Sequence, residues 1–251
     1  MKHMNLRQFV ITSLFVALTL VLGFTPLGII PLGFINVTIL HIPVIIGTIL
    51  LGWRTGLLLG FFFGLTSTLR AFGIPTPASA LVSTLMSASP VFVVIMSMLP
   101  RLLVPVVAHL VYRLISSART HLNAPALSRI ADSLIFAIAF PAVVIALYAL
   151  KALPFWPAAG LFALFAAFEL LFAARTDNAA LTVSAVAGTL TNTIFYLGLM
   201  LLFYHLAGLD TAAILTLITG TGIIAGGTEA IAAAVLTTPV ISALKRVKTN
   251  A

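Results

Sequence analysis

Cysteine and charged residues are what this sequence has least of. None of its 251 residues is cysteine, and only 7% are Asp, Glu, Lys or Arg, whereas 61% are hydrophobic. The missing thiol excludes disulfides, thiolate metal sites and cysteine nucleophiles. A chain of this length cannot bury so much apolar surface in one soluble core. We therefore expect a polytopic membrane protein, whose net charge of +8 meets lipid head groups and water rather than nucleic acid.

The common catalytic and nucleotide-binding motifs are missing as well. The sequence has no G-x-x-x-x-G-K-[ST] loop for ATP, no His-Glu-x-x-His pair and no Gly-x-Ser-x-Gly elbow. His41 and His109 each stand alone in an apolar run, which favours core or helix-pairing residues over metal ligands. We expect no catalytic residue, metal or cofactor in this chain. An intramembrane enzyme that uses Glu229 as acid or base is a remote alternative.

Eight apolar runs are long enough, or nearly so, to cross a bilayer as helices, which takes about 20 residues. They predict an all-α membrane bundle that forms a single domain over residues 1–251. Two Pro-rich connections interrupt the first half: 25–33 should be an ordered or re-entrant loop, and 73–90 a lid. The eight runs are 7–25, 36–52, 55–72, 91–115, 130–150, 156–174, 179–206 and 211–244.

The positions of the cations orient this bundle, because short cytoplasmic loops are enriched in Lys and Arg. With the N-terminus inside, eight crossings place ten of the thirteen basic residues in the cytoplasm and only Lys151 outside. Both termini are then cytoplasmic. The turn at Trp53 and Arg54, an aromatic residue beside a cation, is typical of the membrane interface and lies on the cytoplasmic side.

Four polar residues from four different runs reach the outer half of the membrane. At about 1.5 Å per residue, they lie ~18 to 24 Å from the cytoplasmic ends of their helices. Ionisable groups inside a membrane usually face the bundle interior and mark a substrate or ion path. The four residues are Arg70, Arg101, Asn192 and Glu229.

Each of these residues also has a purely structural interpretation. Arg101 either pairs with Glu229 to hold two helices together or, since two arginines face one glutamate, binds a carboxylate of a small substrate. Arg70 would alternatively snorkel to the interface. The small and polar residues around Asn192 act as contacts between helices or as ligand contacts. The glycines at 220–222 and 226–227 either break the last helix or allow close packing.

Several longer motifs carry a family resemblance. TPLGIIPLGFINVTI, HIPVIIGTILLG, FGLTSTLRAFGIPTP, Pro100-Arg101 and AGTLTNTIFYLGLM occur in this order. They resemble the S components of energy-coupling factor (ECF) vitamin transporters, and the pantothenate-type group most of all. The resemblance covers about residues 5–117 and 180–247 and implies a six-helix core with both termini in the cytoplasm. The stretch 123–176 departs from it and would add an inserted hairpin, which gives eight segments.

The resemblance implies a prokaryotic plasma-membrane protein that is not an enzyme. It would capture a vitamin on the outer side and release it inward by toppling against a transmembrane coupling subunit, while two partner ATPase subunits hydrolyse ATP. It assigns docking on the coupling subunit to the small residues Ser13 and Ala17, where the family usually has alanine twice. A stand-alone secondary transporter or channel for a small organic anion is the alternative. The resemblance places the substrate site at Asn36, Arg70, Arg101, Asn192 and Glu229.

Overall fold

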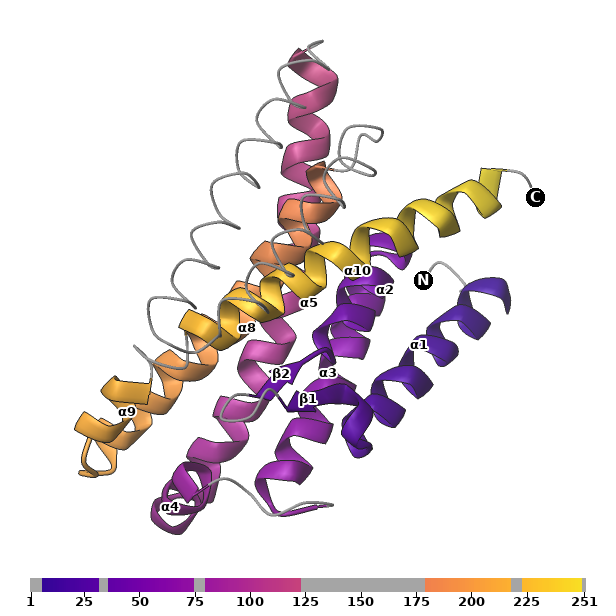
Figure 1. Cartoon of the computed structure of the whole chain (residues 1–251). Helices are drawn as coiled ribbons and strands as arrows, with labels where there is room; N and C mark the ends of the chain where they lie inside the picture. Colours follow the sequence, from indigo (N-terminus) through magenta and orange to yellow (C-terminus); the bar gives the residue numbers. More distant parts are fainter. Residues whose placement is uncertain (1–5, 32–35, 75–79, 123–178, 218–222, 250–251) are drawn as a thin grey trace, which may run out of the picture.

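The computed structural model describes residues 6–31, 36–74, 80–122, 179–217 and 223–249, and these form a helical bundle with one short strand pair (Figure 1). The predicted insertion at 123–176 lies outside the described residues. The elements in chain order are α1 (Leu6–Phe24), η1 (Pro26–Gly28), β1 (Ile29–Pro31), β2 (Asn36–Thr38), α2 (His41–Leu51), α3 (Trp53–Ala71), α4 (Ala80–Ala88), α5 (Pro90–Leu122), α8 (Ala179–Leu206), α9 (Ala212–Leu217) and α10 (Ile223–Thr249).

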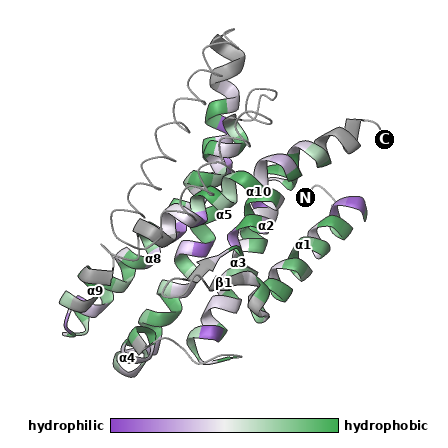
Figure 2. Cartoon of the chain, in the orientation of Figure 1, coloured by the Kyte–Doolittle hydropathy of each residue, from purple (hydrophilic) through white to green (hydrophobic). Residues whose placement is uncertain are grey.

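Four helices of the described chain are long and apolar enough to cross a membrane: Leu6–Phe24, Pro90–Ser117, Ala180–Leu206 and Gly226–Leu244. α2 is a shorter apolar helix. This confirms the helical class, whereas the number of eight segments and the side of the termini stay predictions. Figure 2 shows hydrophobic residues along most of α1 and α5, whereas α3 and α8 include pale and hydrophilic turns.

The first connection differs from the sequence prediction in one respect. The run 36–52 was expected to be helical throughout, but its helix begins at His41, because Asn36–Thr38 pairs as a strand with Ile29–Pro31. The pairing is antiparallel and aligns Ile29 with Thr38. Backbone at membrane depth needs internal hydrogen bonds, and a strand pair supplies them where proline and glycine prevent a helix. The expected ordered loop is therefore a β-hairpin.

The remaining boundaries follow local chemistry. Gly52 separates α2 from α3 with a φ of 95°, a value that favours glycine, so the predicted turn is found there. The connection 73–90, predicted as a lid, contains helix α4 between Ala80 and Ala88. The run 211–244 is described as α9 and α10, with residues 218–222 between them outside the described chain.

The helices pack around two apolar clusters. α5 lies along α3 and α8, α8 also packs on α10, and α1 packs on α3 (Figure 1). The larger cluster joins fully buried residues of α2, α3 and α5, among them Ile45, Leu59 and Val104. The second joins α4, α5, α8 and α9, and in it the rings of Phe92 and Phe203 stack at 4.6 Å. Phe63 of the first cluster lies beside Arg101, one of the polar residues described below.

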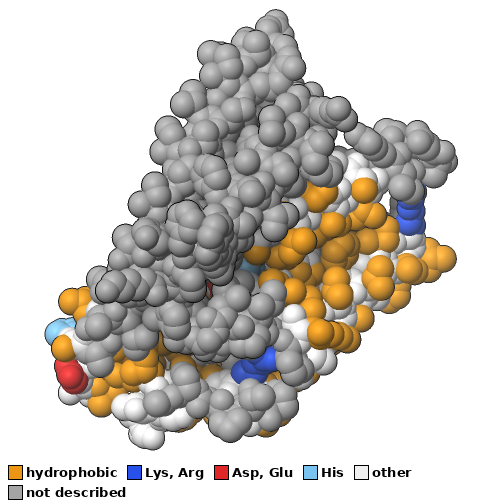
Figure 3. All heavy atoms as spheres, viewed as in Figure 1, with side chains coloured by type: hydrophobic (Ala, Val, Ile, Leu, Met, Phe, Trp, Pro, Cys, Tyr) orange, Lys and Arg blue, Asp and Glu red, His pale blue; other side chains and the backbone are white. Residues whose placement is uncertain are grey.

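Most large apolar side chains of α1 point outward, although Phe15 is buried in the first cluster. Thr12, Thr19 and Gly23 face the bundle, whereas Leu14 is 66% exposed. Figure 3 shows hydrophobic side chains gathered on this surface, at the right of the view. Small residues allow close helix contacts in membranes, and lipid accepts the apolar side.

Gly60 sets the distance between α3 and α5. A Cβ at this position would lie 2.6 Å from the carbonyl oxygen of Arg101 and 3.2 Å from Pro105 Cγ. We expect Gly60→Ala to force the two helices apart and to lower the free energy of unfolding by about 1–3 kcal/mol. Thermal denaturation of the detergent-solubilised protein measures this loss.

Gly198 provides the matched control for that experiment. It lies in α8, and a Cβ there would meet nothing within 4 Å. Alanine is favoured over glycine in a helix by about 1 kcal/mol, so Gly198→Ala should leave the melting temperature unchanged or raise it. Equal losses in both variants would contradict close packing at Gly60.

Candidate functional site

Arg101 of α5 is enclosed by aromatic rings from two neighbouring helices. Its guanidinium carbon lies 4.5 Å from the ring centroid of Tyr196 in α8 and 5.5 Å from that of Phe63 in α3. Both distances allow cation–π attraction. The Nε atom is buried and has no hydrogen-bond partner. Arg101 is therefore held in place while part of its donor set remains free to bind an anion.

The Pro100-Arg101 pair explains how this arginine is positioned. Pro100 lies inside α5 and has no N–H, so the carbonyl of Met96, four residues earlier, loses its usual helical partner. The Arg101 Nη1 donates a hydrogen bond to this oxygen at 3.1 Å. The arginine thus satisfies a carbonyl that its neighbouring proline leaves open, in a buried setting where an unpaired carbonyl is costly.

Glu229 of α10 connects the β1–β2 hairpin to the bundle. Its Oε1 accepts a hydrogen bond from the backbone N–H of Thr38 in β2 at 2.9 Å, and its Oε2 accepts one from Thr193 Oγ1 in α8 at 3.4 Å. The side chain is only 6% exposed. The carboxylate therefore joins three elements that are far apart in the sequence.

Arg101 and Glu229 do not form the direct ion pair that was one interpretation of the sequence. The partners of Glu229 among the described residues are the donors on Thr38 and Thr193. The two charges nevertheless lie near enough to interact electrostatically. The Glu229 carboxylate is held by Thr38 and Thr193 and does not form an ion pair with Arg101. The Arg101 Nε therefore has no carboxylate partner in the described chain.

Asn192 contributes a second unsatisfied polar group. The residue is 7% exposed, and its Oδ1 is buried without a hydrogen-bond partner. It lies in α8 one turn before Tyr196, on the same helix face. By contrast, the hydroxyls of Thr189 and Thr191 donate to carbonyls of their own helix. Within this polar run, the structure therefore singles out the amide as the group that lacks a partner.

The glycines of the last helix act as packing residues where they are described. Gly226 lies within the continuous helix α10, and a Cβ there would lie 2.9 Å from Thr193 Cγ2. Close approach of α10 to α8, rather than a broken helix, is the interpretation that holds at this position. This contact also keeps Thr193 within reach of Glu229. Residues 220–222 lie outside the described chain.

The other two predicted site residues, Arg70 and Asn36, lie at the end of α3 and in β2. Arg70, in the last turn of α3, donates from Nη2 to the carbonyl of Thr25 at 3.2 Å, and its Nε is buried without a partner. Asn36 aligns with Pro31 in the strand pair, and only its backbone is described. Arg101 and Glu229 are thus electrostatic neighbours, and Asn192 lies one turn before Tyr196, whose ring contacts Arg101. No hydrogen bond in the described chain joins Arg70 to these residues.

The sequence alone did not identify the aromatic and backbone groups of the site. Tyr196 and Phe63 were counted as parts of apolar runs, although the spacing of four residues from Asn192 to Tyr196 indicates a shared helix face. The Thr38 amide has no sequence signal, because any residue but proline supplies an N–H. His41, interpreted as a core residue, is fully buried as expected.

The predicted docking residues lie on the outer surface of α1. Ser13 and Ala17 are exposed, one turn apart, between larger exposed side chains such as Val10 and Leu14. Ser13 and Ala17 have shorter side chains than their exposed neighbours on this face. Small residues of this kind let a second helix approach closely.

The chain is similar in sequence to known transport proteins. The family described as "ECF transporter, substrate-specific component" matches residues 7–241. Over 78 residues the chain is 38% identical to a protein named pantothenic acid transporter PanT from Lactococcus lactis subsp. cremoris (strain MG1363). This alignment covers 29% of the present chain and 39% of that relative, so the chain matches less than half of the relative's length.

Proposed function

Because the chain belongs to the substrate-specific components of ECF transporters, we propose that it captures a small water-soluble vitamin, with pantothenate as the first candidate. The family comprises membrane transport components rather than enzymes. The name of the partially matching PanT protein supports pantothenate over other vitamins. The proposed site contains Arg101, Asn192 and Glu229, with Arg70 and Asn36 contributed by the outer connections.

The observation that carries the proposal is the pair of unsatisfied groups on facing helices. Arg101 Nε in α5 and Asn192 Oδ1 in α8 are both buried without partners. A guanidinium matches the geometry of a carboxylate, and an amide oxygen accepts from a hydroxyl or an N–H. Pantothenate carries a carboxylate together with hydroxyl and amide groups. A ligand of this class would satisfy both residues at once.

Delivery to the cytoplasm would depend on other subunits. We infer docking of the exposed Ser13–Ala17 face of α1 on a transmembrane coupling subunit, and toppling powered by two ATPase subunits. The absence of a phosphate-binding loop from the sequence agrees with ATP hydrolysis elsewhere. In this arrangement both termini and the Trp53 turn face the cytoplasm of a prokaryotic cell.

Calorimetric titration of the purified protein tests the substrate. Pantothenate should give saturable binding, whereas panthenol, in which a hydroxymethyl group replaces the carboxylate, should bind at least ~30-fold more weakly because a buried charge partner contributes about 2 kcal/mol or more. Thiamine, a cationic vitamin, is the second control. Equal binding of pantothenate and panthenol would contradict a carboxylate contact, and no heat with pantothenate would remove it as the substrate.

Uptake experiments separate the coupled importer from a stand-alone transporter or channel. Cells that contain the coupling subunit and its ATPases should accumulate pantothenate, and ATP depletion should abolish this uptake. Equal uptake by cells that lack the coupling subunit, insensitive to ATP depletion, would favour the stand-alone alternative.

A further inference from the structure

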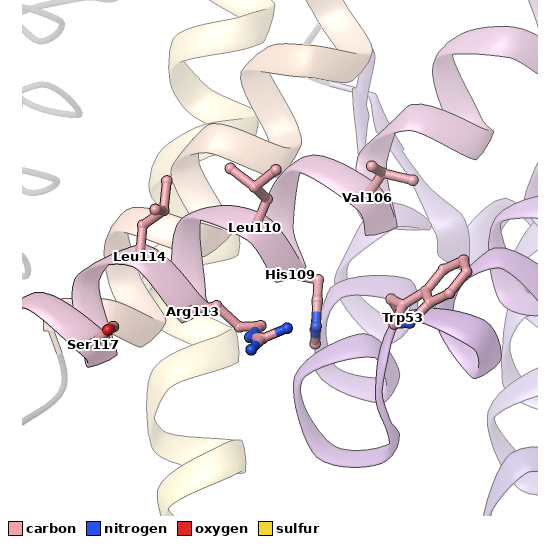
Figure 4. A pocket seen from close by; sticks show the side chains of 7 residues that line it. All are labelled: Trp53, Val106, His109, Leu110, Arg113, Leu114 and Ser117. Atoms are coloured by element: carbon pink, nitrogen blue, oxygen red, sulfur yellow. The ribbon is translucent and has the colours of Figure 1, made fainter.

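A groove lies on the second half of α5, C-terminal to Arg101. The groove has a volume of about 510 Å³. One of its walls is α5 and the other is Trp53, at the start of α3 (Figure 4). This size lies within the range of about 300–1,000 Å³ that is typical of small-molecule sites. The remaining lining residues all come from α5: Val106, His109, Leu110, Arg113, Leu114 and Ser117.

The lining of the groove separates into two parallel ridges. Val106, Leu110 and Leu114 follow one another at intervals of four residues and form an apolar ridge. His109, Arg113 and Ser117 follow the same spacing and form a polar ridge beside it, and Figure 4 shows the Arg113 side chain directed toward His109. A ligand in this groove therefore meets aliphatic groups along one side and a cation with polar neighbours along the other.

The charges of the groove match an anion. Arg113 has no carboxylate partner within the described part of the chain, where the acidic residues are Asp210 and Glu229. The Nδ1 atom of His109 is buried without a hydrogen-bond partner. Arg54 lies over the Trp53 ring, with its guanidinium carbon 5.7 Å from the ring centroid. It is a second cation near the groove, although it does not line it.

The depth of the groove matches the membrane interface. Tryptophan is enriched where lipid head groups meet the hydrocarbon region, and arginine at this level contacts lipid phosphates. Leu110 and Leu114 are 53% and 61% exposed, so the apolar ridge is open to the surroundings of the bundle. The distribution of cations in the sequence assigns this end to the cytoplasmic leaflet, which is rich in anionic lipid.

We propose that this groove binds an anionic phospholipid of the cytoplasmic leaflet. The head-group phosphate contacts Arg113 beside His109 and Ser117, and the upper part of an acyl chain lies along Val106, Leu110 and Leu114. Trp53 closes the groove against the chain. Lipid bound here sits at the junction of α5 with the α2–α3 turn, away from Arg101 and Glu229, and so constitutes a second ligand site in the protein.

Quenching of tryptophan fluorescence by brominated lipids tests this site. The variant Trp156→Phe leaves Trp53 as the single tryptophan, because the sequence contains two. In phosphatidylcholine vesicles, brominated phosphatidylglycerol should quench Trp53 at a lower mole fraction than brominated phosphatidylcholine. Arg113→Ala should reduce this preference about fivefold, the effect expected for one arginine near an anionic surface, whereas Arg113→Lys should retain most of it.

Arg7 provides the matched control, because it is an exposed arginine on α1. Arg7→Ala should leave the preference unchanged, and the wild-type preference should persist at 1 M salt, where the Debye length is only ~3 Å. Three outcomes would overturn the proposal in favour of diffuse attraction between the protein's cations and anionic lipid. They are equal quenching by the two lipids, equal effects of Arg7→Ala and Arg113→Ala, and complete loss of the preference in salt. Absence of quenching by either lipid would overturn it in favour of a protein-covered groove.

Discussion

Replacement of Arg101 by methionine should abolish pantothenate binding and leave the protein folded. Removal of one partner from a buried charge pair costs about 2–5 kcal/mol, so affinity should fall by ~30-fold to more than 1,000-fold. Stability should fall by about 1–3 kcal/mol at most, because the Met96 carbonyl loses its donor. Removal of a buried charge and packing of methionine between the Tyr196 and Phe63 rings offset part of this loss. Calorimetry gives the affinity, and thermal denaturation gives the stability.

Two further variants distinguish a ligand contact from a structural role. Arg101→Lys keeps the charge and loses the planar fork, so an intermediate loss of affinity is expected. Arg54→Ala removes an arginine at the start of α3, beside Trp53, and should leave pantothenate binding intact. Tight binding by Arg101→Met would exclude Arg101 from the site. A folded Arg101→Met protein that has lost binding is the combination that a purely structural arginine would not produce.

Replacement of Glu229 by alanine should release the β1–β2 hairpin. The hydrogen bond from the Thr38 amide to the Glu229 carboxylate is the described side-chain link between β2 and α10. Hydrogen bonds to charged groups contribute about 1.5–3 kcal/mol, so exchange of the Thr38 amide with deuterium should accelerate roughly ten- to a hundredfold. Hydrogen–deuterium exchange with mass spectrometry of peptides that contain Thr38 measures this change.

Thr193→Val supplies the control, because it removes the other donor to Glu229 and leaves the Thr38 contact in place. Exchange at Thr38 should then stay close to the wild-type rate. If Glu229→Ala leaves the amide as protected as before, the carboxylate does not hold the hairpin.

The sequence predicted the long helices well and the hairpin poorly, for a physical reason. α1, α3, α5 and α8 coincide with apolar runs long enough to allow only one interpretation. The segment Asn36–Thr38 joined the run of α2 because a short apolar stretch has no periodicity that separates strand from helix. What makes this segment a strand is its pairing with Ile29–Pro31 and the hydrogen bond from Thr38 to Glu229, and both are tertiary contacts.

The candidate site was predictable to the extent that polar residues are rare in apolar helices. Arg101, Asn192 and Glu229 were found on this ground, since a membrane helix contains a charge or amide only for a reason. Tyr196 and Phe63 were missed, because an aromatic ring in an apolar run is equally suited to a core. Which donors and acceptors lack partners depends on how helices pack, and the sequence does not contain that information directly.

The hydrogen bond from Arg101 to the Met96 carbonyl has a thermodynamic consequence for capture. An arginine side chain carries about 2 kcal/mol of rotamer entropy, which a flexible residue would lose when the ligand arrives. Here the loss occurs during folding, because Pro100 opens the carbonyl that anchors the guanidinium within its own helix. A receptor prepared in this way binds up to ~30-fold more tightly than one that must order the same side chain on contact. Two adjacent residues, Pro100 and Arg101, thus supply this preorganisation.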